Sequence, residues 1–245
     1  MKFFNLIVIV FLFVLAACQQ KSSTPDYIIL GGMIENAMGD SLVIYRNDDV
    51  LSKIALDQQG RFYDTLDLTS DYYDIVYKGK FTTVYLQEGD SLEMNVDMRK
   101  FDESLDFSGP NSEVNNYLAD KKLLRNEIGK KLDIRTLYGM EEDSFSSNIK
   151  KIEAEFIDLY NKASLPQNFA DIERENIRYE MIYDTWKYES YHGYFSQKDS
   201  FEASASFKQQ FESLDFTDEA LFMTVPKYRE MVVMHFSSNG LDSLE

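Results

Sequence analysis

Apolar and polar residues alternate with a period of two from Tyr27 to about Gly109. The clearest example is the segment 92–98, in which four apolar residues alternate with three polar ones. This alternation is typical of a strand with one buried face and one face in water. Similar short runs recur at intervals of roughly ten residues, separated by turn residues, which is typical of sandwiches and barrels. We therefore expect seven or eight strands and no helix among them.

Three turn signals in this region each contain both Gly and Asp and lie between two short apolar runs, which favours hairpins. The expected strand pairs are 83–86 with 92–98, 53–56 with 61–62, and Ile34 with 42–44. A further strand is expected over 72–77.

The period changes to that of a helix after Gly109-Pro110. Apolar residues then recur at spacings of three and four, the pattern of amphipathic helices. The expected stripes cover 114–132, 145–159, 172–186, 207–214 and 228–235. Asn111 or Ser112 suits the cap of the first helix, and Pro226 suits the first turn of the last. The sequence thus predicts an α+β fold, with an N-terminal antiparallel β-sandwich or open barrel over 27–110 and a C-terminal helical array over 111–245.

The first 18 residues have the layout of a secretory signal. Lys2 precedes an apolar run over 3–17, and the small pair Ala16-Ala17 stands directly before Cys18, the one cysteine of the chain. The run is shorter than the roughly 20 residues that a membrane-spanning helix needs. This order resembles a bacterial lipoprotein signal, in which the cysteine becomes the lipid-bearing N-terminus. We therefore expect residues 1–17 to be removed and Cys18 to be lipidated.

A lipidated Cys18 implies a membrane anchor without a transmembrane helix, because several acyl chains together hold a protein on a bilayer. Residues 18–26 are short, polar and free of large apolar side chains, so they are expected to form a flexible tether. Gln19 follows the cysteine, and resemblance to lipoprotein sorting rules favours the outer membrane over the inner one. We expect a cell-envelope lipoprotein that faces the periplasm.

The chain is strongly acidic, with a formal net charge of −17. A surface of this charge repels nucleic acid phosphates, which argues against a nucleic acid partner. It also disfavours adsorption to anionic lipid, so the expected membrane contact is through the N-terminal acyl chains. The remaining expected partner is an envelope protein whose identity the sequence does not name.

No group of residues has the spacing of a catalytic or metal site. His235 lies on the apolar stripe of the last predicted helix and is expected to pack or to cap that helix. His192 lies in an aromatic helix end and has no second His or Cys nearby that could share a metal. Glycine-rich phosphate loops, Gly-x-Ser-x-Gly and Cys-x-x-Cys are all missing from the sequence. We therefore expect no catalytic residue, no cofactor and no metal ligand.

One dense group of aromatic residues lies near the end of the third helical stripe. It includes Tyr183, Trp186, Tyr188 and Tyr191. Tyr and Trp are favoured at protein contacts, because each combines a large apolar area with a polar tip. Helical core packing explains about half of these positions, and any exposed members would form a possible contact face.

Several segments resemble the front part of Bacteroidetes lipoproteins that carry a thioredoxin-like thiol:disulfide interchange domain at the C-terminus. They are Gly31-Gly32-Met33-Ile34, Asp57 with Gly60-Arg61-Phe62, Tyr72-Tyr73, Leu86-Gln87-Glu88-Gly89-Asp90-Ser91-Leu92, Phe107-Ser108-Gly109 and Asn115-Asn116-Tyr117-Leu118. The resemblance implies a β-rich segment, then helices, then a redox domain.

The redox chemistry of that family needs a Trp-Cys-x-x-Cys turn with a reactive thiolate. Here Trp186 is followed by Lys187, and Cys18 is assigned to the lipid. Residues 27–245 contain no cysteine, so we expect them to catalyse no thiol:disulfide exchange.

Three hypotheses about function follow. The preferred one is a non-catalytic envelope lipoprotein that binds or positions a partner. The second is a truncated thiol:disulfide interchange lipoprotein whose thioredoxin-like domain is absent from this chain. The third is a glycan or peptide binder that uses the aromatic group. An in-frame Trp-Cys-x-x-Cys encoded downstream of Glu245 would favour the second.

Overall fold

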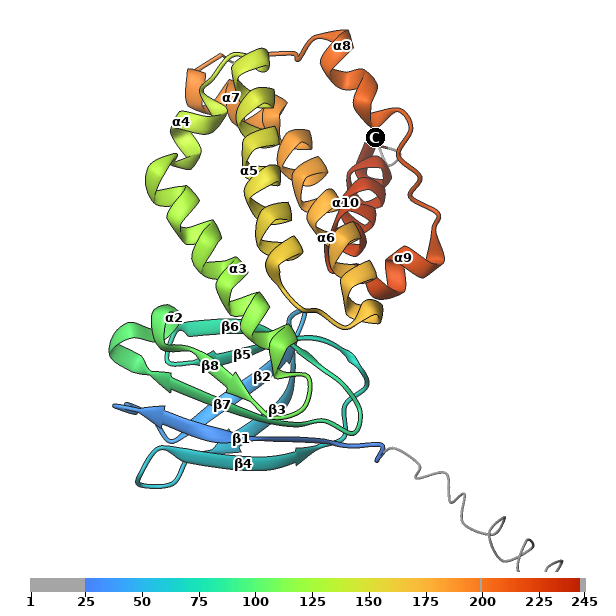
Figure 1. The fold of residues 1–245 in the computed structure, drawn as a ribbon. Coiled ribbons are helices and arrows are strands. Elements are labelled where there is room, and N and C mark those ends of the chain that lie inside the picture. The colour runs from blue at the N-terminus through green and yellow to red at the C-terminus, as the bar shows by residue number, and fades with distance from the viewer. Residues whose placement is uncertain (1–24, 199, 243–245) are drawn as a thin grey trace, which may run out of the picture.

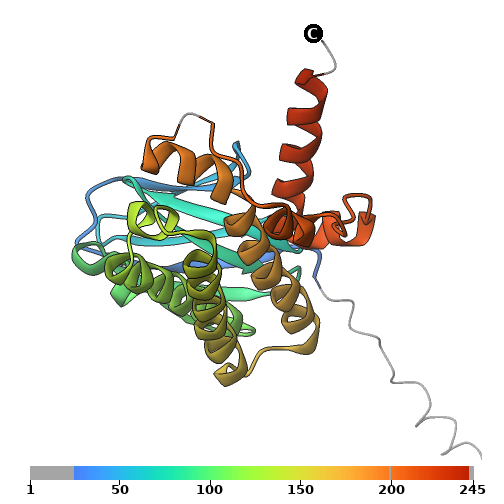
Figure 2. The same ribbon diagram turned by 90° about the horizontal axis from the view of Figure 1, so that it is seen from above.

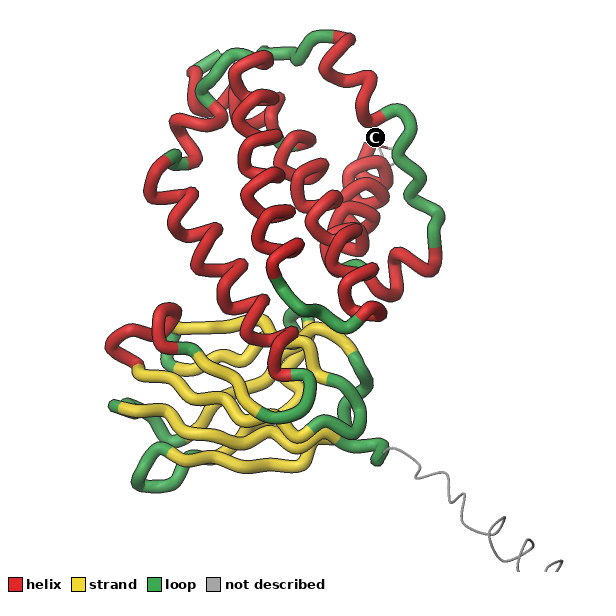
Figure 3. The backbone as a smooth tube through the Cα atoms, viewed as in Figure 1, coloured by secondary structure: helices red, strands yellow, loops and turns green. Residues whose placement is uncertain are grey.

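A computed structural model describes residues 25–198 and 200–242. All its strands lie before residue 109, with two short helical segments among them, and the longer helices follow from Ser112 (Figure 3). The helices stand on one side of a β-sandwich, and α3 rises from the sandwich into the helical layer (Figure 1). This arrangement confirms the predicted α+β class. The signal segment 1–17, Cys18 and residues 19–24 lie outside the described residues.

In the described residues, eight strands form two four-stranded sheets. They are β1 (Ile28–Glu35), β2 (Ser41–Arg46), β3 (Asp49–Ala55), β4 (Arg61–Leu66), β5 (Asp71–Tyr77), β6 (Lys80–Leu86), β7 (Ser91–Asp97) and β8 (Asp106–Ser108). The first sheet has the order β4-β1-β7-β8 and the second the order β3-β2-β5-β6. All pairs are antiparallel except β1 with β7, which is parallel. The predicted antiparallel sandwich is therefore confirmed, with β1–β7 as a parallel pair within it.

The core of the sandwich follows from the period-two pattern. Leu92, Met94 and Val96 of β7 are at most 3% exposed, while Ser91 and Glu93 on the same strand point to solvent. Alternate residues of the other strands meet them from the facing sheet, including Ile44 and Ile75. Because successive side chains of a strand point to opposite faces, this alternation places one apolar row in the core.

The three predicted hairpins are wrong. In each case the two strands belong to opposite sheets: β6 and β7, β3 and β4, and β1 and β2 do not pair. The connecting segments are four or five residues long, 87–90, 56–60 and 36–40. A loop of that length reaches across the roughly 10 Å between two stacked sheets. Gly and Asp therefore mark the turn without showing which sheet the chain enters next.

The observed hairpins have two-residue loops. β5 and β6 are joined by Lys78-Gly79, with φ of 49° and 76°, and β2 and β3 are joined by Asn47-Asp48, with a φ of 55° at Asn47. Turns of two residues with positive φ match the right-handed twist of paired strands. Loop length therefore distinguishes the two kinds of connection. Loops of two residues join paired strands, and loops of four or five residues cross from one sheet to the other.

The helical region contains four long helices and several short ones. The elements are η1 (Met98–Lys100), α2 (Phe101–Ser104), α3 (Ser112–Lys131), α4 (Ile134–Tyr138), α5 (Glu142–Lys162), α6 (Gln167–Trp186), α7 (Tyr188–Ser196), α8 (Ala205–Lys208), η2 (Gln209–Phe211), α9 (Glu219–Thr224) and α10 (Pro226–Asp242). The four long predicted stripes correspond to α3, α5, α6 and α10. Contrary to prediction, η1 and α2 intervene between β7 and β8. Seen from above, α10 extends past the edge of the sandwich (Figure 2).

Two adjacent asparagines fasten α3 to both sheets. The Asn115 side chain accepts a hydrogen bond from the backbone N–H of Tyr85 at 2.8 Å and donates one to its carbonyl oxygen at 3.0 Å. Asn116 makes the same pair of bonds with Phe107, at 2.9 and 2.8 Å. Tyr85 lies in β6 and Phe107 in β8, which are edge strands of the two sheets. The start of α3 therefore completes backbone hydrogen bonding on both sheet edges.

We expect Asn115→Ala to lower the free energy of unfolding by about 2–4 kcal/mol, because it leaves two backbone groups without partners in a site where Asn115 is 1% exposed. Asn116 is half-buried, so water can replace its bonds, and Asn116→Ala should cost about 1 kcal/mol. Urea denaturation of the two variants measures the difference. Equal losses would contradict the assigned role of Asn115.

Within the described part of the chain, no helix combines the length and apolar character needed to cross a bilayer.

Candidate functional site: a cleft between the sandwich and the helices

A cleft of about 550 Å³ lies where the outer face of the β3-β2-β5-β6 sheet meets α3, α6 and α10. Its sheet side is formed by β2, β5 and β6, and its helix side by the three helices. The lining residues are Tyr45, Arg46, Asn47, Tyr72, Tyr73, Asp74, Phe81, Thr83, Leu118, Lys121, Lys122, Arg125, Asn126, Asn176, Glu180, Pro226, Lys227, Arg229 and Glu230. Pockets of this size that lie between two structural layers are common ligand sites.

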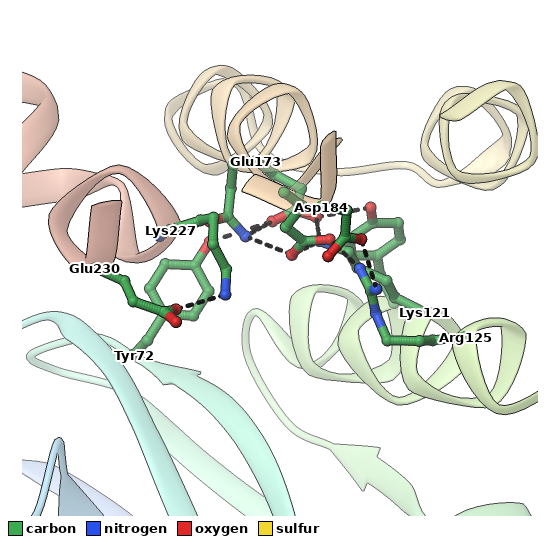
Figure 4. A network of polar contacts seen from close by, with 10 residues as sticks. Tyr72, Lys121, Arg125, Glu173, Asp184, Lys227 and Glu230 are labelled. Carbon is green, nitrogen blue, oxygen red and sulfur yellow. Dashed lines mark hydrogen bonds and ion pairs between the residues drawn. The ribbon is translucent and has the colours of Figure 1, made fainter. Parts of the chain in front are cut away.

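A buried charge network forms one end of the cleft (Figure 4). Lys121 of α3 donates to Glu173 at 2.6 Å and to Glu180 at 2.8 Å, and both acids lie on α6. Glu173 has no exposed surface and accepts a second hydrogen bond, at 2.9 Å, from the Tyr117 hydroxyl. The Tyr72 hydroxyl of β5 also contacts Glu173, at 3.4 Å. The network thus ties together a strand and two helices.

Two opposing effects set the pKa values of the network: burial disfavours the charged form of each group, and the neighbouring opposite charges favour it. Burial raises the pKa of Glu173, and the Lys121 ammonium only partly offsets this effect. For Glu180 burial acts in the same direction, but Lys121 and Arg125 outweigh it and lower its pKa. Burial alone would lower the pKa of Lys121, yet the two carboxylates raise it. Lys121 and Glu180 are therefore held in their charged forms.

Three further ion pairs lie beside the network toward the cleft mouth. Arg125 of α3 bonds Glu180 and lies 3.8 Å from Asp184. On the opposite side, Lys227 of α10 pairs with Glu230 and sits 4.4 Å from the centre of the Tyr183 ring. These contacts connect α10 to α6 beside the cleft.

The tyrosine hydroxyls of the network give a prediction for alkaline pH. Burial, together with Glu173, raises the pKa of Tyr117 far above its ordinary value of 10.0. Above pH 10 the unfolded chain loses this proton while the folded chain keeps it, so the free energy of unfolding falls as pH rises. One such group contributes a slope of up to about 1.4 kcal/mol per pH unit.

Tyr117→Phe should therefore make the loss of stability between pH 10 and 11 shallower by about 1 kcal/mol per pH unit. Urea unfolding at a series of pH values measures this slope. A variant that loses stability as steeply as the parent chain would show that Tyr117 ionises equally in both states.

Aromatic rings cover the sheet side of the cleft. Phe81 is 51% exposed, and the Lys122 ammonium lies 4.4 Å from its ring centre. Tyr72 is half-buried and packs against Tyr85, with 5.1 Å between ring centres. Tyr45 is half-buried at the end of β2. Phe81, Tyr72 and Tyr45 thus place aromatic surface in the cleft, next to charged side chains.

The cleft continues into a second hollow of about 1100 Å³, and the two share Arg46, Asn47, Tyr73, Pro226, Arg229 and Glu230. This extension is more apolar, with Leu51, Met223 and Val233 exposed along it. A third hollow, of about 730 Å³, lies on the other sheet over Gly31 and Gly32. It is lined by that sheet and its loops, without a contribution from the helices.

The four aromatic residues singled out from the sequence do not form one face. Tyr188 is fully buried, donates to the Met140 carbonyl at 2.8 Å, and packs 4.4 Å from the Phe145 ring centre. It therefore belongs to the helical core and is not part of an exposed surface. Tyr191 is half-buried in the same apolar cluster, 4.9 Å from Tyr138.

Tyr183 and Trp186 belong to a different apolar cluster, between α6 and α10. Trp186 packs near Phe216 and His235, at 5.9 and 6.3 Å between ring centres. Tyr183 contacts Lys227, which lines the cleft, so it is the one member of the group beside the candidate site.

Both histidines pack among rings. His192 is fully buried, and its Nδ1 lies 2.9 Å from the carbonyl oxygen of Tyr138. His235 stacks on Phe216 at 4.2 Å with an interplanar angle of 13°. Among the described residues, no group of His, Cys, Asp or Glu is arranged to hold a metal ion.

The charged network was not predicted, because its charged residues are not part of the apolar stripes that predict the helices. Its signal lies in the spacing of polar residues along two helices. Tyr117, Lys121 and Arg125 repeat every four residues on α3, while Glu173 and Glu180 stand seven apart on α6. Such spacing places each set on one face of its helix. Two faces of opposite charge predict helices that pack through ion pairs.

No protein-family model and no curated protein matches the sequence. Two solved structures are similar over part of their length. A DUF3823 family protein from Parabacteroides merdae is 16% identical over 36% of this chain and 48% of that one, with a TM-score of 0.22. A candidate cell adhesion protein from Bacteroides ovatus is 13% identical over 34% of this chain and 42% of that one, with a TM-score of 0.23. The chain thus spans less than half the length of either structure.

Proposed function

We propose that this chain is a lipid-anchored protein of the cell envelope that binds a small ligand in the cleft between its sandwich and its helices, without catalysing a reaction. The observation that carries the proposal is the convergence of six elements, β2, β5, β6, α3, α6 and α10, on one cleft of about 550 Å³. The flat rings and polar side chains that line it are the usual components of a ligand site.

The anchor part of the proposal rests on Leu15-Ala16-Ala17-Cys18. A lipid at Cys18 would hold the described residues at the membrane through the short segment that follows it. The acidic character of the chain supports an anchor of this kind, because an acidic surface is repelled by anionic lipid headgroups. In this account the acyl chains provide the membrane contact and the folded part stays free to bind.

Mass spectrometry of the N-terminal peptide from native membranes tests the anchor. We expect residues 1–17 to be absent and Cys18 to carry acyl groups. Cys18→Ser should remove the protein from the membrane fraction or leave an uncleaved precursor. An unmodified Cys18, or a retained signal segment, would rule the anchor out.

Binding in the cleft is tested by native mass spectrometry of the anchored protein after mild extraction from envelope membranes. The expected result is a bound small molecule that is lost from the Tyr45→Ala/Phe81→Ala variant. The matched control is Tyr194→Ala, which removes a 77% exposed tyrosine of α7 that is not among the cleft residues. A molecule that stays bound to the cleft variant, or no bound molecule in any sample, would count against the proposal.

The resemblance to the front part of thiol:disulfide interchange lipoproteins extends this proposal. A β-rich half followed by helices is the order that the resemblance implies, and the docking role of Asn115-Asn116 gives one shared segment a physical purpose. We propose that the described residues serve as a binding module in a protein of that kind. Sequencing the gene beyond the Glu245 codon tests this relation, since an in-frame Trp-Cys-x-x-Cys would support it.

A further inference from the structure

We infer that the ligand of the cleft is an organic anion, with a carboxylate or phosphate group joined to a flat apolar ring. This inference rests on the proposed function and specifies its ligand. Its starting point is the contrast between the cleft and the rest of the chain. The whole chain has 42 acidic and 25 basic residues, whereas six basic and three acidic residues line the cleft.

The second observation concerns hydrogen-bond donors at the cleft mouth. Arg125 on the helix side and Arg46 on the sheet side have 46% and 36% of their side chains exposed. Arg46 meets Asp71 through one nitrogen at 2.7 Å. Arg125 meets Glu180 through one terminal nitrogen, and its other terminal nitrogen lies 3.8 Å from Asp184. A guanidinium has five N–H donors, so each arginine keeps donors that can point to a ligand. Both side chains suit two-pronged binding of a carboxylate or phosphate.

The three carboxylates that line the cleft are engaged within the protein. Glu180 receives bonds from Lys121, Arg125 and Asn176. Asp74 accepts from the Thr83 hydroxyl at 2.6 Å, and Glu230 pairs with Lys227. All six basic side chains of the cleft are also paired with carboxylates of the protein. The N–H donors that Arg46 and Arg125 keep at the cleft mouth therefore carry the preference for a ligand rich in acceptors.

The flat part of the ligand follows from the rings next to these donors. Phe81 is half exposed on β6, and Tyr45 directly precedes Arg46 on β2. A ligand ring that packs between Phe81 and Tyr45 would bury aromatic surface. The anionic group of the same ligand would then reach the two arginines. Aromatic acids have this chemistry. Uronic acid sugars share the carboxylate and offer the C–H face of a sugar ring, in place of a flat one, for packing on aromatic side chains.

Titrations followed by amide chemical shifts of the isotope-labelled mature chain, residues 18–245 with Cys18→Ser, test the inference. The probes are 3-phenylpropanoate, its neutral analogue 3-phenylpropanamide, digalacturonate and inorganic phosphate. We expect at least one of the two organic anions to shift amides of β2, β6 and α3. It should bind at least about tenfold more tightly than the amide, because charge-assisted hydrogen bonds are lost with the charge. Comparison of the two organic anions shows whether the cleft prefers an aromatic ring or a sugar ring. Inorganic phosphate should bind more weakly than the preferred anion.

The variants Arg46→Gln and Arg125→Gln should each weaken binding of that anion about tenfold. Lys122→Met offers a second test on α3 that leaves the Glu180 pair intact. The matched control is Lys208→Gln, which removes an exposed lysine paired with Glu189, away from the cleft lining. Its affinity should equal that of the parent chain.

Equal binding of the acid and the amide in the cleft would overturn the anionic ligand while leaving the cleft as a binding site. Shifts confined to residues outside the cleft, or no shifts with any probe, would overturn both the ligand class and the proposed site. If inorganic phosphate bound as tightly as the organic anions, the ring would add nothing to affinity, and that part of the inference would be wrong.

Discussion

Glu173→Ala should lower the free energy of unfolding by about 3–5 kcal/mol at neutral pH, because it leaves a buried ammonium with half of its pairing. Lys121 is 8% exposed and contacts only Glu173 and Glu180 among the carboxylates of the described residues. The Tyr117 hydroxyl loses its partner in the same variant. Urea denaturation followed by circular dichroism measures the loss.

Two further variants separate charge from packing. Glu173→Gln keeps an acceptor oxygen for Tyr117 and Lys121, so it should cost about 1–2 kcal/mol. The double variant Lys121→Met/Glu173→Leu removes both charges and should recover most of the stability lost in Glu173→Ala, since a buried pair can be replaced by apolar residues. A double variant as unstable as the sum of its two single variants would contradict a direct pairing.

Gly32→Ala should lower the free energy of unfolding by a similar amount, about 3–5 kcal/mol. Gly32 has a φ of +141°, and a Cβ atom there would lie 1.9 Å from the carbonyl oxygen of Met94. Gly32 pairs with Met94 in the parallel β1–β7 ladder, so the clash is with a backbone held on both sides. Strain at such a φ costs about 1–3 kcal/mol, and forcing the strands apart adds about as much.

Gly79→Ala is the matched control. Gly79 also has a positive φ, of +76°, but no heavy atom lies within 4 Å of the position of its Cβ. We expect a cost of about 1 kcal/mol, from backbone strain alone. Comparison of the two variants by thermal and urea unfolding separates the close strand approach from the φ preference. Equal costs would show that the approach of β1 to β7 is not tight.

The predictable part of the fold is the part that local patterning controls. The alternation over 92–98 correctly identified a strand with a buried row, and the stripe over 145–159 correctly identified α5. The predicted strand pairs were wrong, because the same pattern fits a strand in either sheet. The parallel β1–β7 pair joins segments separated by all the strands of the second sheet, and no turn signal reports such a contact.

The candidate site was less predictable for a related reason. Phe81, Arg46 and Arg125 are far apart in the sequence and come together only when the helices dock on the sheet. Their residue types are ordinary, so no single segment contains a recognisable motif. Opposite charges at helical spacing on α3 and α6 were the available signal. That signal predicts a helix–helix contact, while the sheet that closes the cleft follows only from the three-dimensional fold.

The central claim is that the cleft between the sandwich and the helices is the ligand site. Crystallographic screening of the mature chain with a chemically diverse set of small fragments tests it most directly, because the fragments report where binding occurs without assuming a ligand class. The account predicts that bound fragments gather against Tyr45, Phe81 or Arg125. Fragments that gather instead in the hollow over Gly31 and Gly32, with the cleft empty, would contradict it.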